Sequence, residues 1–315
     1  MREAIVLLNM GGPNNLDEVE MFLHNMFNDP YIIRTKSSLL RRFIAGIITL
    51  SRTKKSQDIY RKIGGKSPLV DHTKTLVNRL QEAVGNEVTV DFVMRYTPPM
   101  ANEVCQRLKK QGIEKVYLLP LYPQYSSTTA QSSLDDFEAA AHAIGWSVIT
   151  SEIKHFFANE MYNRCLIERI KESLGEETAE SFELIFSAHG LPQQIVDQGD
   201  PYQRHVVAHV ALMEKTMKEA GLFFHGVHLA YQSKVGPMKW LEPSLDDTLH
   251  TLQNKRVIIV PIAFTVDNSE TDFELAIEYA EVAHDLGYEE YRVCRCPNDH
   301  PFFVQTLKEL YLKMK

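Results

Sequence analysis

The feature that most constrains the fold of this chain is a regular change of hydrophobic pattern. Short apolar runs rich in β-branched residues alternate with amphipathic stretches whose apolar residues recur every three to four positions. The runs that we expect to form strands are 4–10, 88–96, 115–122, 146–153, 182–189, 227–232, 256–264 and 291–296. Helical periodicity is clear at 101–111 and 272–286. This alternation predicts an α/β fold with largely parallel sheets.

The predicted strands fall into two similar sets. IVLLNMGGP resembles LIFSAHGLP, VDFVMRYTPP resembles VHLAYQSKVGP, and KVYLLPLYPQYSST resembles RVIIVPIAFTVDNSET. In each pair an apolar strand ends in a polar loop that contains glycine, proline or both. The pattern predicts two similar halves with a boundary near 165–180, and we assign 1–170 to the first and 171–315 to the second. Coincidental similarity among ordinary βαβ units is the alternative explanation.

In open parallel sheets, ligands bind beyond the carboxyl ends of the strands. The polar and functional side chains expected there are Met10, Arg95, Tyr125, His189, Gln232 and residues 268–270. Two facing halves would also form a cleft between them. The sequence contains no GxGxxG, Walker, GxSxG or CxxC motif, so nucleotide, phosphate and hydrolase functions lack their usual support.

The charge of the chain is distributed in two opposed regions. The net charge is −7 and the pI is near 6.0, which disfavours nucleic acid as a partner of the whole chain. Residues 31–66 contain ten Lys or Arg and one acid, whereas residues 257–291 contain nine acids and no Lys or Arg. A local anionic partner at the first region and a cation at the second remain open.

The side chains best suited to chemistry are His189 and a row of acids in the second region. His189 follows a strand, where it can act as a base or as a metal ligand, or can be a loop histidine that bonds the backbone. Glu270, Glu274 and Glu278 share one face of a helix, with Glu281 close by and no Lys to offset their repulsion. Such a row suits a cation, because carboxylate oxygens are good ligands. An acidic surface helix is the alternative.

Residues 37–56 combine cationic and apolar character. The apolar run 43–50 is far too short to span a bilayer but is long enough to lie on one, where its cationic neighbours would reach anionic headgroups. Those neighbours are Arg41, Arg42, Arg52, Lys54 and Lys55. Two other interpretations are open. The run can pack against the core with its charges solvated, or the charges can hold carboxylates of a ligand.

The cysteines indicate a reducing compartment. Four cysteines in 315 residues give no disulfide framework, and the N-terminus lacks the features of a signal peptide, so we expect a cytoplasmic protein. Cys294 and Cys296 form a CxC pair on a predicted strand, which could hold a metal. Because no further ligands accompany them, we expect core cysteines instead.

Taken together, the motifs resemble those of the ferrochelatase family over nearly the whole length of the chain. Their order and spacing are far more specific than any single motif. The matching segments are LLNMGGP (7–13), YRKIGGKSPL (60–69), MRYTPP (94–99), LPLYPQYSSTT (119–129), SAHGLP (187–192), GDPY (199–202), YQSKVGPMKWLEP (231–243) and PIAFTVDNSET (261–271).

The resemblance implies a chelatase-like fold, with two Rossmann-like halves around a central porphyrin cleft. The implied activity is that of a lyase in haem biosynthesis, which inserts Fe²⁺ into protoporphyrin IX and releases two protons. His189 corresponds to the family's active-site histidine, which abstracts protons or binds iron, and Glu270 to the facing carboxylate. Glu274, and with it Glu278, corresponds to the acidic helix that carries metal in or protons out. We therefore expect the metal to contact His189, Glu270 and Glu274.

Further positions match the family's porphyrin-binding residues. Those that line or support the pocket are Met10, Tyr125, Phe264 and Trp240. Those around the propionates are Arg52, Lys55, Tyr60, Ser67 and Tyr202. Arg95, near the carboxyl end of the predicted strand 88–96, is a further porphyrin-binding candidate. The basic, apolar segment 37–50 corresponds to the active-site lip through which some members contact the membrane. We therefore expect peripheral contact with the inner face of the cytoplasmic membrane.

Two departures from the family pattern matter. Asn268 stands where many members have a histidine, so any mechanism that needs a second imidazole is in doubt and more weight falls on His189 and Glu270. Ser127 occupies the internal cysteine position of the [2Fe–2S] members and no cysteine follows Cys296, so we expect no cluster and no permanently bound cofactor. Met10 resembles the protoporphyrin-using members rather than those that use coproporphyrin.

Other functions fit the same pattern less well. A related enzyme could insert another metal, such as cobalt, into a different tetrapyrrole. A non-catalytic porphyrin carrier could use the same two-lobed architecture, although nothing argues for a loss of His189 or Glu270. A two-lobed periplasmic binding protein is disfavoured by the absent signal peptide and the cysteine usage.

Overall fold

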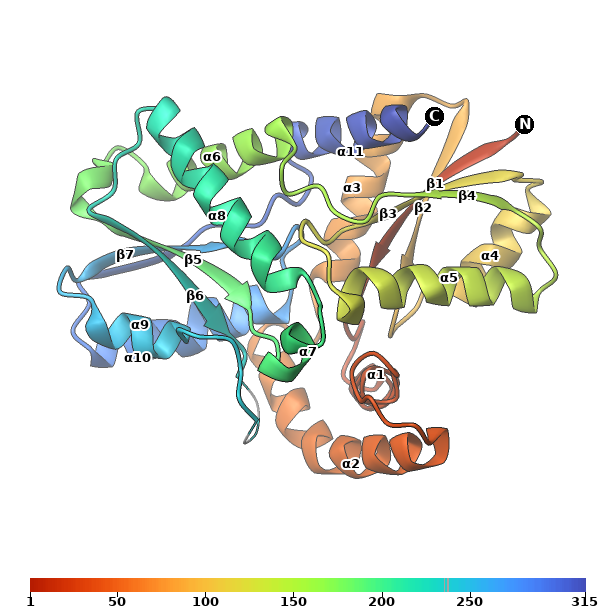
Figure 1. Ribbon diagram of the computed structural model, residues 1–315, viewed down its shortest axis with the longest axis horizontal. Helices are drawn as coiled ribbons and strands as arrows, with labels where there is room; N and C mark the ends of the chain where they lie inside the picture. Colours follow the sequence, from red (N-terminus) through yellow and green to blue (C-terminus); the bar gives the residue numbers. More distant parts are fainter. Residues whose placement is uncertain (235, 237) are drawn as a thin grey trace. The chain divides into compact units, whose positions relative to one another are not determined.

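The computed structural model describes residues 1–234, 236 and 238–315 of the chain (Figure 1). The chain divides into two compact units, one of Met1–His155 with Val304–Lys315 and the other of Phe156–Phe303. The expected boundary at residue 170 instead lies within a helix of the second unit, α6 (Glu160–Leu174). The last helix, α11 (Pro301–Met314), begins at the end of the second unit, and most of its residues belong to the first.

The first unit contains a four-stranded parallel sheet. Its strands are β1 (Glu3–Asn9), β2 (Val88–Met94), β3 (Lys115–Pro120) and β4 (Ile149–Glu152), in the order β2-β1-β3-β4. The interior strand β1 is an almost continuous apolar run because helices cover both of its faces. Helices α4 (Ala101–Lys110) and α5 (Ser132–Ala143) pack on one face through Val104, Leu108 and Phe137.

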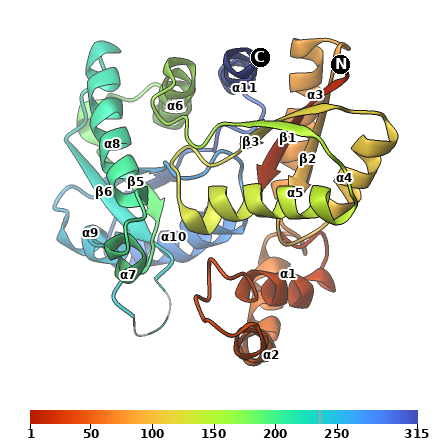
Figure 2. The ribbon, with the colours of Figure 1, turned by 45° about the vertical axis from the view of Figure 1, so that its right-hand side comes forward.

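The remaining helices of the first unit are α1 (Glu18–Phe27), α2 (Ser38–Lys62) and α3 (Leu69–Val84). Helices α1 and α2 lie side by side (Figures 1 and 2), and α3 packs beside β2. The side chain of Ser37 caps α2 by accepting a hydrogen bond from the backbone N–H of Leu40. A short π-helix, η1 (Ser127–Gln131), lies between β3 and α5.

The second unit repeats this sheet with the same strand order. Its strands are β5 (Glu183–His189), β6 (Gly226–Gln232), β7 (Arg256–Pro261) and β8 (Glu290–Val293), in the order β6-β5-β7-β8, and all pair in parallel. All the predicted strands are therefore present, and the repeated order confirms the two similar halves.

The helices of the second unit cover both faces of its sheet. Helices α6 and α8 (Tyr202–Glu219) contact β7 and β6, respectively. The opposite face packs against α9 (Leu245–Thr251), η3 (Glu270–Glu278) and α10 (Tyr279–Asp285) through Leu249, Leu275 and Ala283. Two short helices, η2 (Ala179–Ser181) and α7 (Gln193–Asp197), flank β5.

The helix predicted over 272–286 has two parts. Residues 270–278 form a π-helix, in which backbone hydrogen bonds join residues five apart, and only α10 is α-helical. Periodicity analysis finds an amphipathic helix but does not distinguish these two geometries. Turns of π-helix occur frequently at functional sites, and this one begins at Glu270.

Candidate active site

His189 is the last residue of β5, an interior strand of the second sheet. It pairs in register with Gln232, the last residue of β6, so both lie at the carboxyl edge of the sheet. The next residue must be glycine, because a Cβ at Gly190 would lie 2.8 Å from the carbonyl oxygen of Gln232. The Nδ1 atom of His189 lies 2.6 Å from the Gly190 carbonyl oxygen. Since only a protonated nitrogen can bond that oxygen, Nδ1 carries a hydrogen and Nε2 is left for chemistry.

Glu270 faces the second ring nitrogen of His189. Its Oε1 atom lies 3.1 Å from Nε2 of His189. The Glu270 side chain is 25% exposed and the His189 side chain 36% exposed. Its other oxygen, Oε2, is shielded from solvent and has no hydrogen-bond partner among the residues that the structure describes. A carboxylate oxygen without a partner is ready to accept a proton or to contact a cation.

The contact with Glu270 controls the protonation of His189. Burial of the imidazole lowers its pKa, but the charge and hydrogen bond of Glu270, the charge of Glu274 and the bond to Gly190 outweigh burial and raise the pKa to about 9. In the free protein at neutral pH the two side chains therefore form an ion pair.

This ion pair can be observed directly. In the protein without substrates, we expect the His189 ring to stay protonated through neutral pH and to lose its proton with a midpoint near 9. An NMR pH titration of the histidine Cε1–H signals would measure this midpoint, and the signal that disappears in a His189→Gln variant is that of His189. A midpoint at or below the ordinary histidine pKa of about 6.5 would contradict the ion pair.

Glu274 lies one step further along η3 and is already well bonded. It accepts hydrogen bonds from the Ser233 backbone N–H at 2.7 Å, the Ser233 hydroxyl at 2.5 Å and the Gln232 amide at 3.1 Å. Burial and the neighbouring charge of Glu270 raise its pKa, and the bonds from Ser233 partly oppose this. Glu278 is exposed. Only Glu270 and Glu274 of the acidic row therefore lie close to His189.

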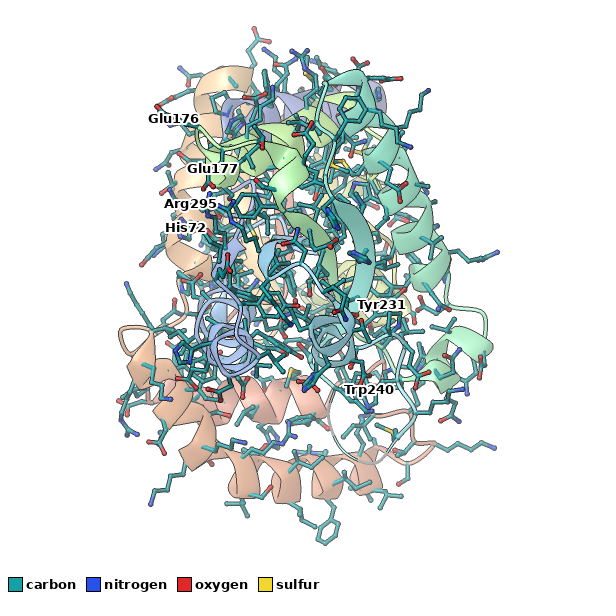
Figure 3. All side chains as sticks on the ribbon, turned by 90° about the vertical axis from the view of Figure 1, so that its left-hand side faces the viewer. His72, Glu176, Glu177, Tyr231, Trp240 and Arg295 are labelled. Atoms are coloured by element: carbon teal, nitrogen blue, oxygen red, sulfur yellow. The ribbon has the colours of Figure 1, made fainter. Side chains whose placement is uncertain are left out.

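Three further predicted residues of the second unit surround His189. The ring of Phe264 meets the imidazole edge-on, with 6.4 Å between ring centroids. Trp240, labelled in Figure 3, packs close to Gly190, since a Cβ there would lie 3.3 Å from its ring. The Tyr202 hydroxyl donates to the carbonyl oxygen of His189 at 2.9 Å. Tyr202 thus holds the main chain of the catalytic candidate, a role that the sequence does not reveal.

The remaining porphyrin-binding candidates belong to the first unit. Met10 is half-buried beside α1, and the Arg52 guanidinium lies over the Phe27 ring at 5.8 Å. Lys55 is exposed, whereas Tyr60 and Ser67 are buried. Tyr125 donates a hydrogen bond of 2.8 Å to Gln131, on the π-helix η1.

Arg95 differs from the other candidates because protein partners occupy its whole guanidinium. Its Nη2 lies 3.1 Å from Asp29, its Nη1 lies 3.3 Å from Asp136, and its Nε donates to Ser132 at 2.9 Å. The Asp29 carboxylate is fully buried and also accepts a bond from the Tyr96 hydroxyl. This network gives Arg95 a structural role beneath the carboxyl edge of the first sheet.

Sequence patterns do not indicate Ser233, which bonds Glu274 through both its backbone N–H and its hydroxyl. Ser233 holds Glu274 from a left-handed backbone conformation, with φ 67°. The signal available in the sequence was the position of Ser233 directly after β6, in the YQSKVGPMKWLEP motif. Val235 and Pro237 of that motif lie outside the described residues.

Neither a preformed metal-ion cluster nor an ionised thiol is found among the described residues. In residues 1–234, 236 and 238–315, no three His, Cys, Asp or Glu side chains are arranged to hold a metal ion. All four cysteines are free and buried. Burial raises the pKa of the thiols of Cys105, Cys165 and Cys294 to about 12, which keeps them protonated.

Comparison with known proteins identifies the family. The family model described as ferrochelatase matches residues 2–315. The chain belongs to the ferrochelatase family. It is 60% identical to the ferrochelatase of Sulfurimonas denitrificans, covering 100% of this chain and 99% of that protein, and 49% identical to that of Nitratiruptor sp., covering 99% and 100%. Ferrochelatases are lyases that insert ferrous iron into protoporphyrin in haem biosynthesis, and this function, predicted from the motifs, is confirmed.

Solved structures support the fold. The chain is similar to SirB from Bacillus subtilis with Fe³⁺, with a TM-score of 0.59 and 12% identity, covering 100% of this chain and 96% of that one. It is also similar to CbiX, described as the terminal enzyme for biosynthesis of sirohaem in denitrifying bacteria, with a TM-score of 0.53, 13% identity and full coverage of both chains. At such low identity the likeness concerns the fold alone. The predicted chelatase-like architecture is confirmed.

Proposed function

We propose that His189 and Glu270 carry the chemistry of this ferrochelatase-family chain. Insertion of iron requires the porphyrin to exchange two pyrrole N–H protons for one Fe²⁺. The observation that supports this assignment is the pairing of His189 Nε2 with Glu270 Oε1 at 3.1 Å, at the carboxyl edge of the second sheet. A pyrrole proton lies in the plane of the macrocycle, so its removal requires a base held at a defined position.

The geometry suggests separate roles for His189 and Glu270 in proton transfer and metal contact. His189 presents Nε2 because Nδ1 is bound to Gly190. In the ion pair Nε2 carries a proton, which must first pass to the facing Glu270 carboxylate, and the neutral Nε2 can then receive a pyrrole proton. Glu270 adds Oε2, which has no partner among the described residues and can contact the incoming Fe²⁺ or pass the proton on. Glu274 would have to exchange its bonds to Gln232 and Ser233 before it bound a metal, so we assign the first contact with Fe²⁺ to Glu270.

The porphyrin-binding residues complete the proposal. Phe264 and Trp240 are apolar surfaces next to His189 and suit the face of a macrocycle. Met10, Tyr125, Tyr60 and Ser67 are assigned to the porphyrin by resemblance, and Arg52 and Lys55 supply charges that suit its propionates. We assign Tyr202 and Arg95 to support rather than to direct contact, since both already bond protein groups. We also propose that no iron–sulfur cluster or other resident cofactor is required.

The direct test is an anaerobic assay of Fe²⁺ insertion by the purified chain, followed by porphyrin absorbance. We expect turnover with protoporphyrin IX to exceed turnover with coproporphyrin III, in keeping with Met10. A parallel assay with Co²⁺ separates iron insertion from the chelation of other metals. Binding of protoporphyrin without metal insertion would indicate a carrier and would contradict the proposal.

We propose a peripheral membrane contact for α2. One face of α2 buries Ala45, but Phe43 and Leu50 on the other face are 67% and 79% exposed and Ile47 is also exposed. Cationic residues lie next to this apolar row, and together they suit a surface of anionic lipid. No described helix has both the length and the apolar character needed to cross a membrane.

Vesicle binding tests this contact. We expect the chain to sediment with phosphatidylglycerol vesicles at low salt, and we expect Phe43→Ser with Leu50→Ser to weaken binding by at least about tenfold, since each lost side chain contributes up to ~1.5–3 kcal/mol of burial. Leu312→Ser is the matched control, because Leu312 is an exposed apolar residue of α11. Equal binding by all three proteins, or no binding by the parent chain, would contradict the membrane contact.

A further inference from the structure

Asn268 lies in the loop between β7 and η3, two residues before Glu270. Its side chain is almost fully buried, with 7% of the residue exposed. A side-chain amide does not titrate near neutral pH, so Asn268 cannot act as an acid or a base. The contacts of Asn268 show what the amide does instead.

The side-chain amide of Asn268 bonds the main chain on both sides. Its Oδ1 atom accepts the backbone N–H of Glu270 at 2.8 Å, and its Nδ2 donates to the carbonyl oxygen of Val266 at 3.1 Å. A reversed amide would place a donor against the Glu270 N–H and an acceptor against the Val266 carbonyl. The two bonds therefore define the orientation of the amide.

The backbone of Asn268 closes the same turn. Its N–H donates to the Thr271 hydroxyl oxygen at 2.9 Å, and its carbonyl oxygen accepts from the Asp272 N–H at 2.9 Å. The first N–H groups of a helix have no partner within the helix, so a side chain that accepts one of them defines how the chain enters the helix. Asn268 performs this capping function for the turn that carries Glu270.

We propose that Asn268 is a positioning residue that holds Glu270 against His189. This inference rests on the proposed function of that pair. Among residues 1–234, 236 and 238–315, the Glu270 carboxylate has one bond, from His189 at 3.1 Å, and its Oε2 has none. Its location therefore depends on the main chain at residue 270, which Asn268 holds. A displacement of about 1 Å in a reacting group can cost on the order of a hundredfold in rate.

Steady-state kinetics of Fe²⁺ insertion test the proposal through two substitutions. Asn268→Ala removes the acceptor, and we expect kcat to fall at least about tenfold while KM for protoporphyrin IX stays within about twofold. Asn268→Ser restores an acceptor suited to a helix N-terminus, and we expect kcat within about threefold of the parent chain. Asn163→Ala is the matched control, because Asn163 is a buried asparagine of the same unit whose amide bonds Phe157 and His209. We expect this control to keep its kcat.

A double-mutant cycle separates positioning from general damage. If Asn268 acts through the Glu270 carboxylate, Asn268→Ala should have little further effect on kcat in a Glu270→Gln background. Additive losses would overturn the proposal, as would an alanine variant with kcat within twofold of the parent chain. A folded serine variant at least tenfold slower than the parent would also overturn it, and this outcome is informative even if the alanine variant does not fold. Full activity of Glu270→Gln would instead refute the proposed function.

Discussion

Replacement of His189 by alanine is expected to lower kcat for Fe²⁺ insertion by at least about a hundredfold, the usual contribution of a positioned general base. The reason is geometric, because Nε2 is the ring nitrogen left for chemistry and Glu270 lies 3.1 Å from it. Porphyrin binding should change little, since Phe264 and Trp240 remain. Initial rates with protoporphyrin IX under anaerobic conditions, together with porphyrin fluorescence titration, would measure both quantities.

Two controls sharpen this experiment. His250→Ala removes an exposed histidine of α9 in the same unit and should leave turnover unchanged. Free imidazole added to His189→Ala should partly restore turnover, because the deleted ring leaves space beside Glu270. Near-normal turnover of His189→Ala would overturn the role proposed for this histidine.

Replacement of Glu270 by glutamine is expected to lower kcat by about a hundredfold while porphyrin binding is mostly retained. The amide keeps the shape of the carboxylate, but it has no negative charge to attract Fe²⁺ or to accept a proton. Unchanged kinetics would exclude Glu270 from the site. Glu278→Gln is the matched control, since Glu278 lies on the same helix but is exposed, and we expect it to have a much smaller effect.

The same variant has a spectroscopic consequence. Glu270 is the main group that raises the pKa of His189, and burial of the ring lowers that pKa. Without the carboxylate charge, the titration midpoint of His189 should fall from about 9 toward the ordinary histidine value. A midpoint that stays near 9 in Glu270→Gln would show that another group stabilises the imidazolium.

The strands illustrate how much of the fold was predictable. All eight were located within a few residues because buried parallel strands are apolar along most of their length and end at polar loops. The boundary between the halves was harder to predict from the sequence, because α6 follows the first sheet in the chain but packs with the second. Contacts between helices and sheets decide to which unit a helix belongs. The hydrophobic pattern of the helix itself does not encode these contacts.

The candidate active site likewise has parts that the sequence predicts and parts that it does not. The motifs pointed to His189 and Glu270 as a pair although they are far apart in the chain, and the structure brings them into contact. The supporting residues were not predicted. The resemblance places Tyr202 around the propionates, whereas its hydroxyl bonds the His189 carbonyl. Ser233 donates two bonds to Glu274, which residue patterns do not indicate. Hydrogen bonds between residues distant in the chain leave little trace in such patterns.

The sequence by itself determined the class of fold, the duplication and the family, because hydrophobic periodicity and ordered motifs are local properties of the chain. It also separated a cationic region from an acidic one. Only the tertiary structure decided where each acid lies relative to His189. It places Glu270 against His189, ties Glu274 to Gln232 and Ser233, and leaves Glu278 in solvent. The physical reason is that bonds between elements distant in the chain, together with a π-helical turn, set the direction and burial of each carboxylate.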